Sequence, residues 1–278
     1  MNTMIKRNTM LYFRDRSNLF FSMLSIMIIV ALFALFLGQG NWGSDEIRDT
    51  WLMAGILGVA AITTSIGAVD VVISDRLNKR AKGFYASPIK RSHITASYIA
   101  SPLIAGILMT TLTAIGFGAY IVIAGGEMPD TVGLIKLFGL ILLSNFTGTA
   151  ILCFIAMLIK SISAWNTIGT IIGTLSGFLM GVYMPVGNLP NAVQIPMVLF
   201  PPFHSAMLFR QILMEKPLEA AYHASSGAIN TTEISDLLGA TYRFNNFEVT
   251  PIMSVLFLVV AGFVFFALSA WRMRKIKE

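Results

Sequence analysis

Long apolar stretches, separated by short polar connections, dominate this sequence. A helix needs ~20 apolar residues to cross a bilayer. Stretches of about that length or longer lie at residues 19–38, 51–73, 97–123, 134–159, 162–183 and 252–271. The pattern predicts an all-α integral membrane protein with six transmembrane helices, in which residues 19–278 form one membrane domain.

The N-terminal residues 1–18 mix basic and apolar side chains. A helical wheel gathers apolar side chains in one wedge, namely Met4, Ile5, Leu11 and Tyr12. This pattern predicts a helix that lies in the cytoplasmic interface of the membrane. Asp15 interrupts the wedge, so a polar tail before the first span is the alternative.

Composition supports a membrane protein and fixes its orientation. The mean hydropathy is +0.73 and only 12% of the 278 residues are charged. Most of the 20 lysines and arginines fall on the N-terminal side when the spans are numbered alternately. The positive-inside rule then places both termini in the cytoplasm. We expect a multi-pass protein of a bacterial plasma membrane, and the net charge of +6 does not indicate binding to nucleic acid.

Several kinds of chemistry have no signature in the sequence. There is no GxxxxGK[ST] phosphate-binding motif and no His or Cys spacing typical of a metal site. The histidines lie in three separate regions, so Ser176 has no membrane-embedded base of the kind an intramembrane protease requires. We therefore expect neither catalysis nor a cofactor on this chain. Asp70, in the second predicted span, is either a functional intramembrane acid or a residue at the interface.

The stretch from Trp165 to Arg210 combines glycines and prolines in an unusual order. Its first half carries glycines at a four-residue spacing: Gly169, Gly173, Gly177 and Gly181. Such a stripe allows close approach of another helix inside a bilayer. The second half is apolar but broken by prolines, and irregular backbone survives at membrane depth only where protein or water satisfies it. We expect a partly buried re-entrant segment within an outer region that spans residues 184–250.

The connection at residues 74–96 is the longest predicted cytoplasmic loop, and it is strongly basic. It either fixes topology by contacting lipid headgroups or docks a cytoplasmic partner. The adjacent aromatic residues Phe84 and Tyr85 favour docking.

Two motifs resemble the membrane subunit, or permease, of an ABC-2 type ABC transporter. Residues 82–91 read KGFYASPIKR, which is similar to the cytoplasmic connection of that family. The run from Gly177 through Met184-Pro185 and Leu189-Pro190 to Arg210 is similar to its outer region. Many relatives carry acids just before the cytoplasmic glycine, whereas here the nearest acid is Asp75.

The resemblance implies two ATP-binding cassette subunits and a second permease, identical or related, as partners, with ATP and Mg²⁺ bound by the ATPase subunits. It assigns coupling to residues of the cytoplasmic connection: Asp75, Arg76, Lys79, Arg80, Lys82, Gly83, Phe84, Tyr85, Ser87 and Pro88. It places a translocation path or dimer face on spans two and five: Thr63, Thr64, Asn166, Gly169, Thr170, Gly173, Thr174, Gly177, Phe178 and Gly181. It implies an outer gate built from Met184, Pro185, Leu189, Pro190, Pro201, Pro202 and Arg210.

The expected cargo is an amphipathic or hydrophobic compound, such as a drug, an antibiotic or an antimicrobial peptide, because the predicted path carries no fixed charge. Export of a lipid-linked polysaccharide or teichoic acid is the alternative within the class. An ion-coupled carrier or a non-transport membrane scaffold is the alternative from another class.

Overall fold

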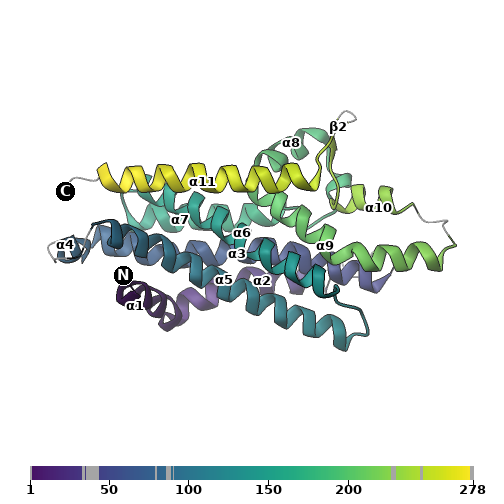
Figure 1. Cartoon of the computed structure of the whole chain (residues 1–278), viewed down its shortest axis with the longest axis horizontal. Coiled ribbons are helices and arrows are strands. Elements are labelled where there is room, and N and C mark those ends of the chain that lie inside the picture. The colour runs from purple at the N-terminus through teal and green to yellow at the C-terminus, as the bar shows by residue number, and fades with distance from the viewer. Residues whose placement is uncertain are drawn as a thin grey trace.

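The chain forms an elongated bundle of long helices (Figure 1). The computed structural model describes residues 2–32, 44–78, 80–85, 91–226, 230–244 and 247–275, together with Leu35 and Ile89. Its helices are α1 (Asn2–Arg14), α2 (Arg16–Leu32), α3 (Asp45–Leu77), α4 (Arg80–Tyr85), α5 (Arg91–Ile123), α6 (Thr131–Leu158), α7 (Ile162–Leu179), the 3₁₀ turn η2 (Val186–Asn188), α8 (Asn191–Leu199), α9 (Pro201–Ala224), α10 (Thr231–Leu238) and α11 (Pro251–Lys275). The short strands β1 (Arg243–Phe244) and β2 (Phe247–Glu248) form an antiparallel hairpin.

Within the described residues, four helices are long and apolar enough to span a membrane: α3, α5, α6 and α11. The bent pair α8–α9 raises the number to five if it is counted as one span. The structure therefore confirms an all-α membrane protein, while the count of six spans stays a prediction. The outer end of the first predicted span falls largely outside the described residues, because α2 is described only to Leu32.

Helix α3 is the centre of the bundle and packs against α2, α5, α6, α7 and α9. It has 33 residues and starts at Asp45, six residues before the predicted span. Ser44 caps it by accepting a hydrogen bond from the Ile47 amide at 3.1 Å. Asp45 and Glu46 lie in its first turn, where carboxylates interact favourably with the helix dipole. These acidic residues therefore belong to the start of the central helix.

The two ends of the bundle carry different elements. Helices α1 and α4 and the C-terminal end of α11 lie at one end, and α10 and the C-terminal half of α9 lie at the other (Figure 1). This arrangement agrees with the predicted placement of both termini on one side. We call the end that carries α4 the inner end and the opposite end the outer end.

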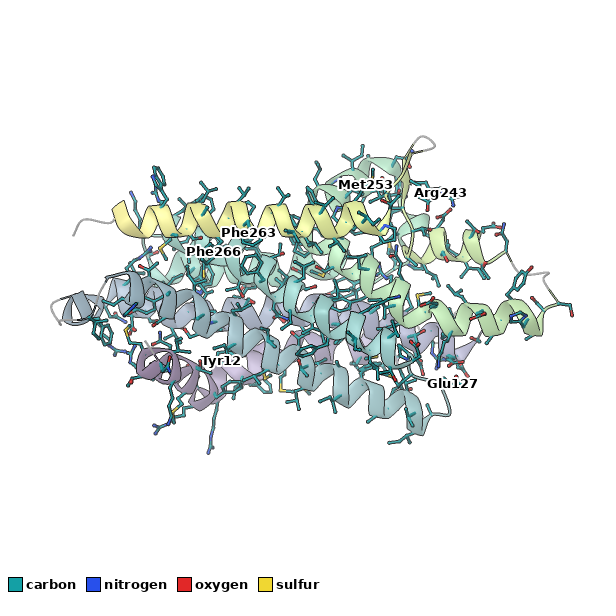
Figure 2. The ribbon with its side chains drawn as sticks, viewed as in Figure 1. Tyr12, Glu127, Arg243, Met253, Phe263 and Phe266 are labelled. Carbon is teal, nitrogen blue, oxygen red and sulfur yellow. The ribbon has the colours of Figure 1, made fainter. Side chains whose placement is uncertain are left out.

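Helix α1 packs on α5 and on the inner part of α3. Its buried residues are Met4, Asn8 and Tyr12, which are spaced four apart and so share one face. Tyr12 lies between α1 and the bundle (Figure 2). Leu11, which the helical wheel placed in the buried wedge, is instead exposed. The predicted amphipathic helix is present, but its buried face is rotated and includes the amide of Asn8.

The predicted outer region at residues 184–250 includes η2, α8, α9, α10 and the β1–β2 hairpin. Helix α9 continues without a break from Pro201 to Ala224. Helices α8 and α9 meet at 97°, a geometry found in both re-entrant loops and broken spans. Pro201 and Pro202 occupy the first turn of α9, where proline is favoured because its missing N–H needs no partner there.

Helix α11 packs on α6 through aromatic rings. The ring of Phe146 lies 5.3 Å from that of Phe263 and 6.1 Å from that of Phe266 (Figure 2). The Thr147 hydroxyl donates a hydrogen bond to the Leu258 carbonyl at 3.0 Å. These contacts fix α11 on the side of α6.

Buried polar side chains join α3, α5 and α6 in the middle of the bundle. The hydroxyls of Ser65 and Thr149 lie 3.1 Å apart, and the Asn145 amide donates to the Thr110 hydroxyl at 3.2 Å. Gly106 makes this contact possible, because a Cβ there would lie 2.4 Å from the Asn145 Oδ1 atom. Interhelical hydrogen bonds of this kind contribute about 0.6 kcal/mol each.

We predict that Gly106→Ala destabilises the protein by about 1–3 kcal/mol, because the added methyl forces Asn145 out of its position. Gly116→Ala is the matched control, since a Cβ at Gly116 meets nothing within 4 Å. Thermal unfolding of the purified protein measures both variants. Equal unfolding temperatures for the two would contradict this account of the α3–α5–α6 contact.

Candidate functional site

A charged contact at the inner end joins α1 to α3. Arg7 donates two hydrogen bonds to the Asp75 carboxylate, from Nη1 to Oδ2 at 2.6 Å and from Nη2 to Oδ1 at 3.1 Å. The Tyr98 hydroxyl of α5 donates to the same carboxylate at 3.1 Å. Asp75 is only 1% exposed. The hydrogen bond to Asp75 raises the pKa of Arg7, despite the opposing effect of partial burial.

Helix α4 attaches to this contact through its aromatic residue. The Arg7 guanidinium lies over the Phe84 ring, 4.9 Å from the ring centre, and Phe84 packs partly against the inner apolar core. We call Arg7, Asp75, Tyr98 and Phe84 the inner node. Residues from α1, α3, α5 and α4 therefore meet at one point.

Arg76 links α3 to the junction between α6 and α7. Its Nη2 atom donates to the Ile159 carbonyl, at the C-terminal end of α6 where α7 is about to begin. A helix C-terminus leaves its last carbonyls without partners inside the helix, and a guanidinium satisfies them well. Both Asp75 and Arg76 therefore bond within the chain, and their role in coupling to an ATPase stays a prediction.

The other predicted coupling residues lie on or near α4. Arg80 and Gly83 are exposed, and a Cβ at Gly83 would meet nothing within 4 Å. Lys82 and Tyr85 also belong to α4. Lys79, Ser87 and Pro88 lie outside the described residues. The structure thus confirms a short helix within the connection and leaves part of its surface open.

Span two does not present its threonines on an exposed face. Thr63 and Thr64 are buried inside the bundle, and the Thr63 hydroxyl donates to the Val59 carbonyl of its own helix at 3.0 Å. Because neighbouring helices surround α3, neither side chain is available to a path on the surface of this chain.

The four glycines of the predicted stripe have different surroundings in the structure. A Cβ at Gly169 would lie 2.9 Å from Ile66, and one at Gly177 would lie 2.4 Å from the Tyr183 ring, so both glycines pack against their own chain. Gly173 faces open space. Gly181 lies beyond the end of α7 with a φ of +64°, a conformation that favours glycine. The four glycines therefore do not form one face for a partner.

Another face of α7 is exposed instead. Asn166, Thr170 and Thr174 are exposed at a four-residue spacing. Exposed apolar side chains accompany them on α7: Ile171, Leu175 and Phe178. We call these six residues the α7 face. Helix α7 contains no charged residue, so the α7 face is polar without being ionic.

A buried arginine organises the outer end. Arg210 of α9 is fully buried and donates hydrogen bonds to carbonyls of three residues: Met180 at 2.8 Å, Gly181 at 2.8 Å and Gly239 at 3.3 Å. Its guanidinium carbon lies 5.4 Å from the centre of the Trp51 ring. The Trp51 indole N–H donates to the Leu238 carbonyl at 2.8 Å. We call Arg210, Trp51 and these carbonyl groups the outer clamp.

Two glycines give the outer clamp its shape. Gly239 ends α10 with a φ of +71°, and a Cβ there would lie 2.6 Å from Val186. Gly181 has the same left-handed conformation, and its Cβ would lie 2.5 Å from the same valine. The two turns present their carbonyl groups to one guanidinium. The clamp therefore joins α3, α9, α10 and the turn that follows α7.

The remaining residues of the predicted outer gate mark the ends of short elements. Pro185 precedes η2, Leu189 follows it, and Pro190 precedes α8. Met184 is exposed, whereas Pro202 is buried at the start of α9. The prolines thus delimit the broken backbone, and Arg210 holds it against the bundle. Whether this segment opens as a gate remains a prediction.

Sequence reasoning missed Arg7, Tyr98 and Trp51 as members of these two contacts. Trp51 is 187 residues from its partner Leu238, and Arg7 is 68 residues from Asp75. The one available signal was the presence of a basic residue in α1 and an unmatched acid near the end of α3.

Comparison with known protein families identifies the chain. The family model for the ABC-2 type transporter matches residues 1–214. That range covers most of the chain, so the chain belongs to the ABC-2 type transporter family. It is a multi-pass membrane permease that associates with a separate ATP-binding subunit and is not itself the ATPase. A search of curated proteins found no match.

We predict that the Arg7–Asp75 pair has a favourable coupling free energy of about 1–2 kcal/mol, reduced from the value of a fully buried pair because Arg7 is 32% exposed. A double-mutant cycle with Arg7→Gln and Asp75→Asn measures it by unfolding of the purified protein. If the two single effects simply added in the double variant, the inner node would not be an energetic contact.

Replacing the buried arginine should weaken the outer end more than replacing an exposed one. We predict that Arg210→Gln destabilises the protein by about 3 kcal/mol, because buried carbonyl groups of the clamp lose their donors. Arg243→Gln is the control, since Arg243 is exposed at the same end (Figure 2). Limited proteolysis of the segment that includes η2 and α10 measures the difference. A cleavage rate equal to that of the control would argue against the clamp.

Proposed function

We propose that the chain is one of two permease halves of an exporter, which moves an amphipathic or hydrophobic compound outward across a bacterial plasma membrane. Two ATP-binding subunits would supply the energy. A drug, an antibiotic or an antimicrobial peptide fits the proposed cargo class. The single observation that carries this proposal is the α7 face.

The α7 face is poorly suited to lipid. Its hydroxyl and amide groups are exposed on a helix without charge. In a bilayer such groups favour contact with another helix or with a water-filled path over contact with acyl chains. A second permease across this face would cover them. When the two halves part, the same surface lines a path of mixed polarity.

The composition of that path supports the cargo class. Thr170 and Thr174 offer hydroxyl groups, and Ile171, Leu175 and Phe178 offer apolar contact area. A molecule with separate polar and apolar parts finds partners for both on such a surface. The absence of fixed charge from α7 disfavours a strongly anionic saccharide carrier as the cargo. The lack of charged residues on α7 also disfavours ion-coupled transport along this helix.

The inner node supports a route for the energy. On helix α4, Arg80 and Gly83 are exposed at the surface of the chain, while Phe84 contacts Arg7. A subunit that docks on α4 therefore pushes on α1 and on the inner end of α3 together. Closure of two ATP-binding subunits would move these helices as a rigid body. The outer clamp would carry that movement from α3 to the segment around α8.

We predict that Thr170→Cys, treated with copper phenanthroline as the oxidant, forms a disulfide with a cysteine of a second permease in the native membrane, which is the same introduced cysteine when the two permeases are identical. Cys153 is the sole cysteine and is buried, so Cys153→Ala gives a suitable background. Phe138→Cys on α6 is the control, because Phe138 is exposed on a different helix. The product is detected by its mobility without reductant and identified by mass spectrometry.

The crosslink also tests export directly. Locking the α7 face should abolish ATP-dependent uptake of an amphipathic fluorescent dye into inside-out vesicles, and reductant should restore it. A crosslink to a different permease would mean that the exporter has two distinct halves. Crosslinking at Phe138→Cys but not at Thr170→Cys would overturn the assignment of the face. Dye transport that persists in the locked state would overturn its role in the path.

A further inference from the structure

A cavity of about 760 Å³ lies at the outer end, between α6, α9, α10 and α11. Its volume falls in the range of ~300–1,000 Å³ that is typical of ligand sites. It lies apart from the α7 face and shares Arg210 with the outer clamp. Figure 2 shows Arg243 and Met253 on the side of this region, where the hairpin leads into α11.

The cavity has a polar outer part and an apolar inner part. On α6, which starts at the outer end, Lys136 precedes Leu140 and Leu143. On the segment that leads into α11, Glu248 precedes Val255. On α9, which runs outward, Leu208 and Ile212 precede Glu215, and Arg210 and Leu218 also line the cavity. Each of the three elements therefore places a charged residue outward of apolar residues.

The charged residues that line the cavity are of both signs: Lys136 and Arg210 are cations, and Glu215 and Glu248 are carboxylates. Arg210 bonds carbonyl groups of the outer clamp. Within the described part of the chain, neither Lys136 nor Glu215 takes part in an ion pair, whereas Glu248 lies 3.4 Å from the Arg243 guanidinium. The cation Lys136 beside two carboxylates is complementary to a headgroup that carries a phosphate and an ammonium. It is less complementary to a headgroup that is only anionic, because the carboxylates would repel it.

The surface around the mouth gives a lipid access. Large apolar side chains are exposed on both sides, namely Ile135, Phe138 and Leu142 on α6 and Ile252 and Leu256 on α11. In a bilayer these side chains contact acyl chains. A lipid of the outer leaflet can therefore enter from the side, with its headgroup at the charged mouth and an acyl chain along the apolar wall.

We propose that this cavity binds one zwitterionic phospholipid of the phosphatidylethanolamine type. Its phosphate lies against Lys136, its ammonium lies against Glu215 and Glu248, and an acyl chain lies against Leu140 and Val255. The lipid fills the space between α6, α9 and α11 and so supports the outer segment from the membrane side.

Glycine at position 139 allows a direct test of this site. Gly139 lines the cavity, and a Cβ there would meet nothing within 4 Å. Gly139→Trp therefore adds a large side chain at the cavity wall from a Cβ that meets no neighbour. Gly116→Trp is the matched control, because Gly116 is also an exposed helical glycine that faces open space, on α5.

The experiment is native mass spectrometry of the full transporter complex, equilibrated with equal amounts of phosphatidylethanolamine and phosphatidylglycerol. We expect the wild type to retain phosphatidylethanolamine selectively, and Gly139→Trp to retain about tenfold less. Gly116→Trp should retain as much as the wild type. Lys136→Gln should also lose the lipid, and Lys136→Arg should restore it.

Two results would overturn the proposal. One is equal retention of phosphatidylethanolamine by Gly139→Trp and the wild type, with both complexes intact. The other is retention of phosphatidylglycerol as strong as that of phosphatidylethanolamine. Neither result bears on the crosslink through the α7 face, so the lipid site and the export function stand or fall separately.

Discussion

The burial of α3 along almost its whole length is the constraint on which the rest of the structure depends. Apolar side chains fill its surface from Ile47 to Ile73, and helices on every side cover them. Because α3 is already surrounded, the contacts that connect the two ends of the chain form at its ends. Asp75 bonds Arg7 at the inner end, and Trp51 contacts Arg210 at the outer end.

In the proposed mechanism, these end contacts are the physical route for coupling. Packed helices shift between discrete arrangements more readily than they deform, because their interiors are close-packed. A push on α4 would reach α3 through the inner node and α10 through the outer clamp. The Asn145–Thr110 and Ser65–Thr149 contacts would keep α5 and α6 with α3 during such a shift.

The parts that we propose to move are those with fewer contacts inside the described chain. None of the described helices covers the α7 face, and the α8–α9 corner holds its 97° bend at a proline boundary. A surface that a second permease would cover and a bent corner are both better suited to opening than the long helices around α3.

Sequence reasoning found several of the long helices but misjudged several contacts. Hydropathy identified α3, α5, α6 and α11 because lipid imposes a length and a composition on every crossing helix. It could not show that Asp75 is buried, since its partner Arg7 lies on a separate helix. The glycine spacing was interpreted as one face for a partner, yet Gly169 and Gly177 pack on Ile66 and Tyr183 of the same chain.

The predicted proline corner illustrates the opposite case. Pro201 and Pro202 act locally, by removing N–H donors at the start of a helix, so their effect could be predicted without knowing the packing. The bend before α9 is accordingly where the sequence indicated a break. Arg210 was included in the predicted gate, but its fixed position inside the bundle depends on two left-handed glycines whose conformation only the fold reveals.

The most direct test of the central claim is hydrogen–deuterium exchange of the transporter complex, with and without ATP. If α3 moves as one rigid helix, its amides from Asp45 to Leu77 should stay protected in both states. Hydrogen exchange should instead change with ATP in the segment from η2 to α8. This segment lies at the outer end, away from α4, where we propose that the ATP-binding subunits dock. An ATP-dependent rise in exchange within the middle of α3, with no change in that outer segment, would contradict the account.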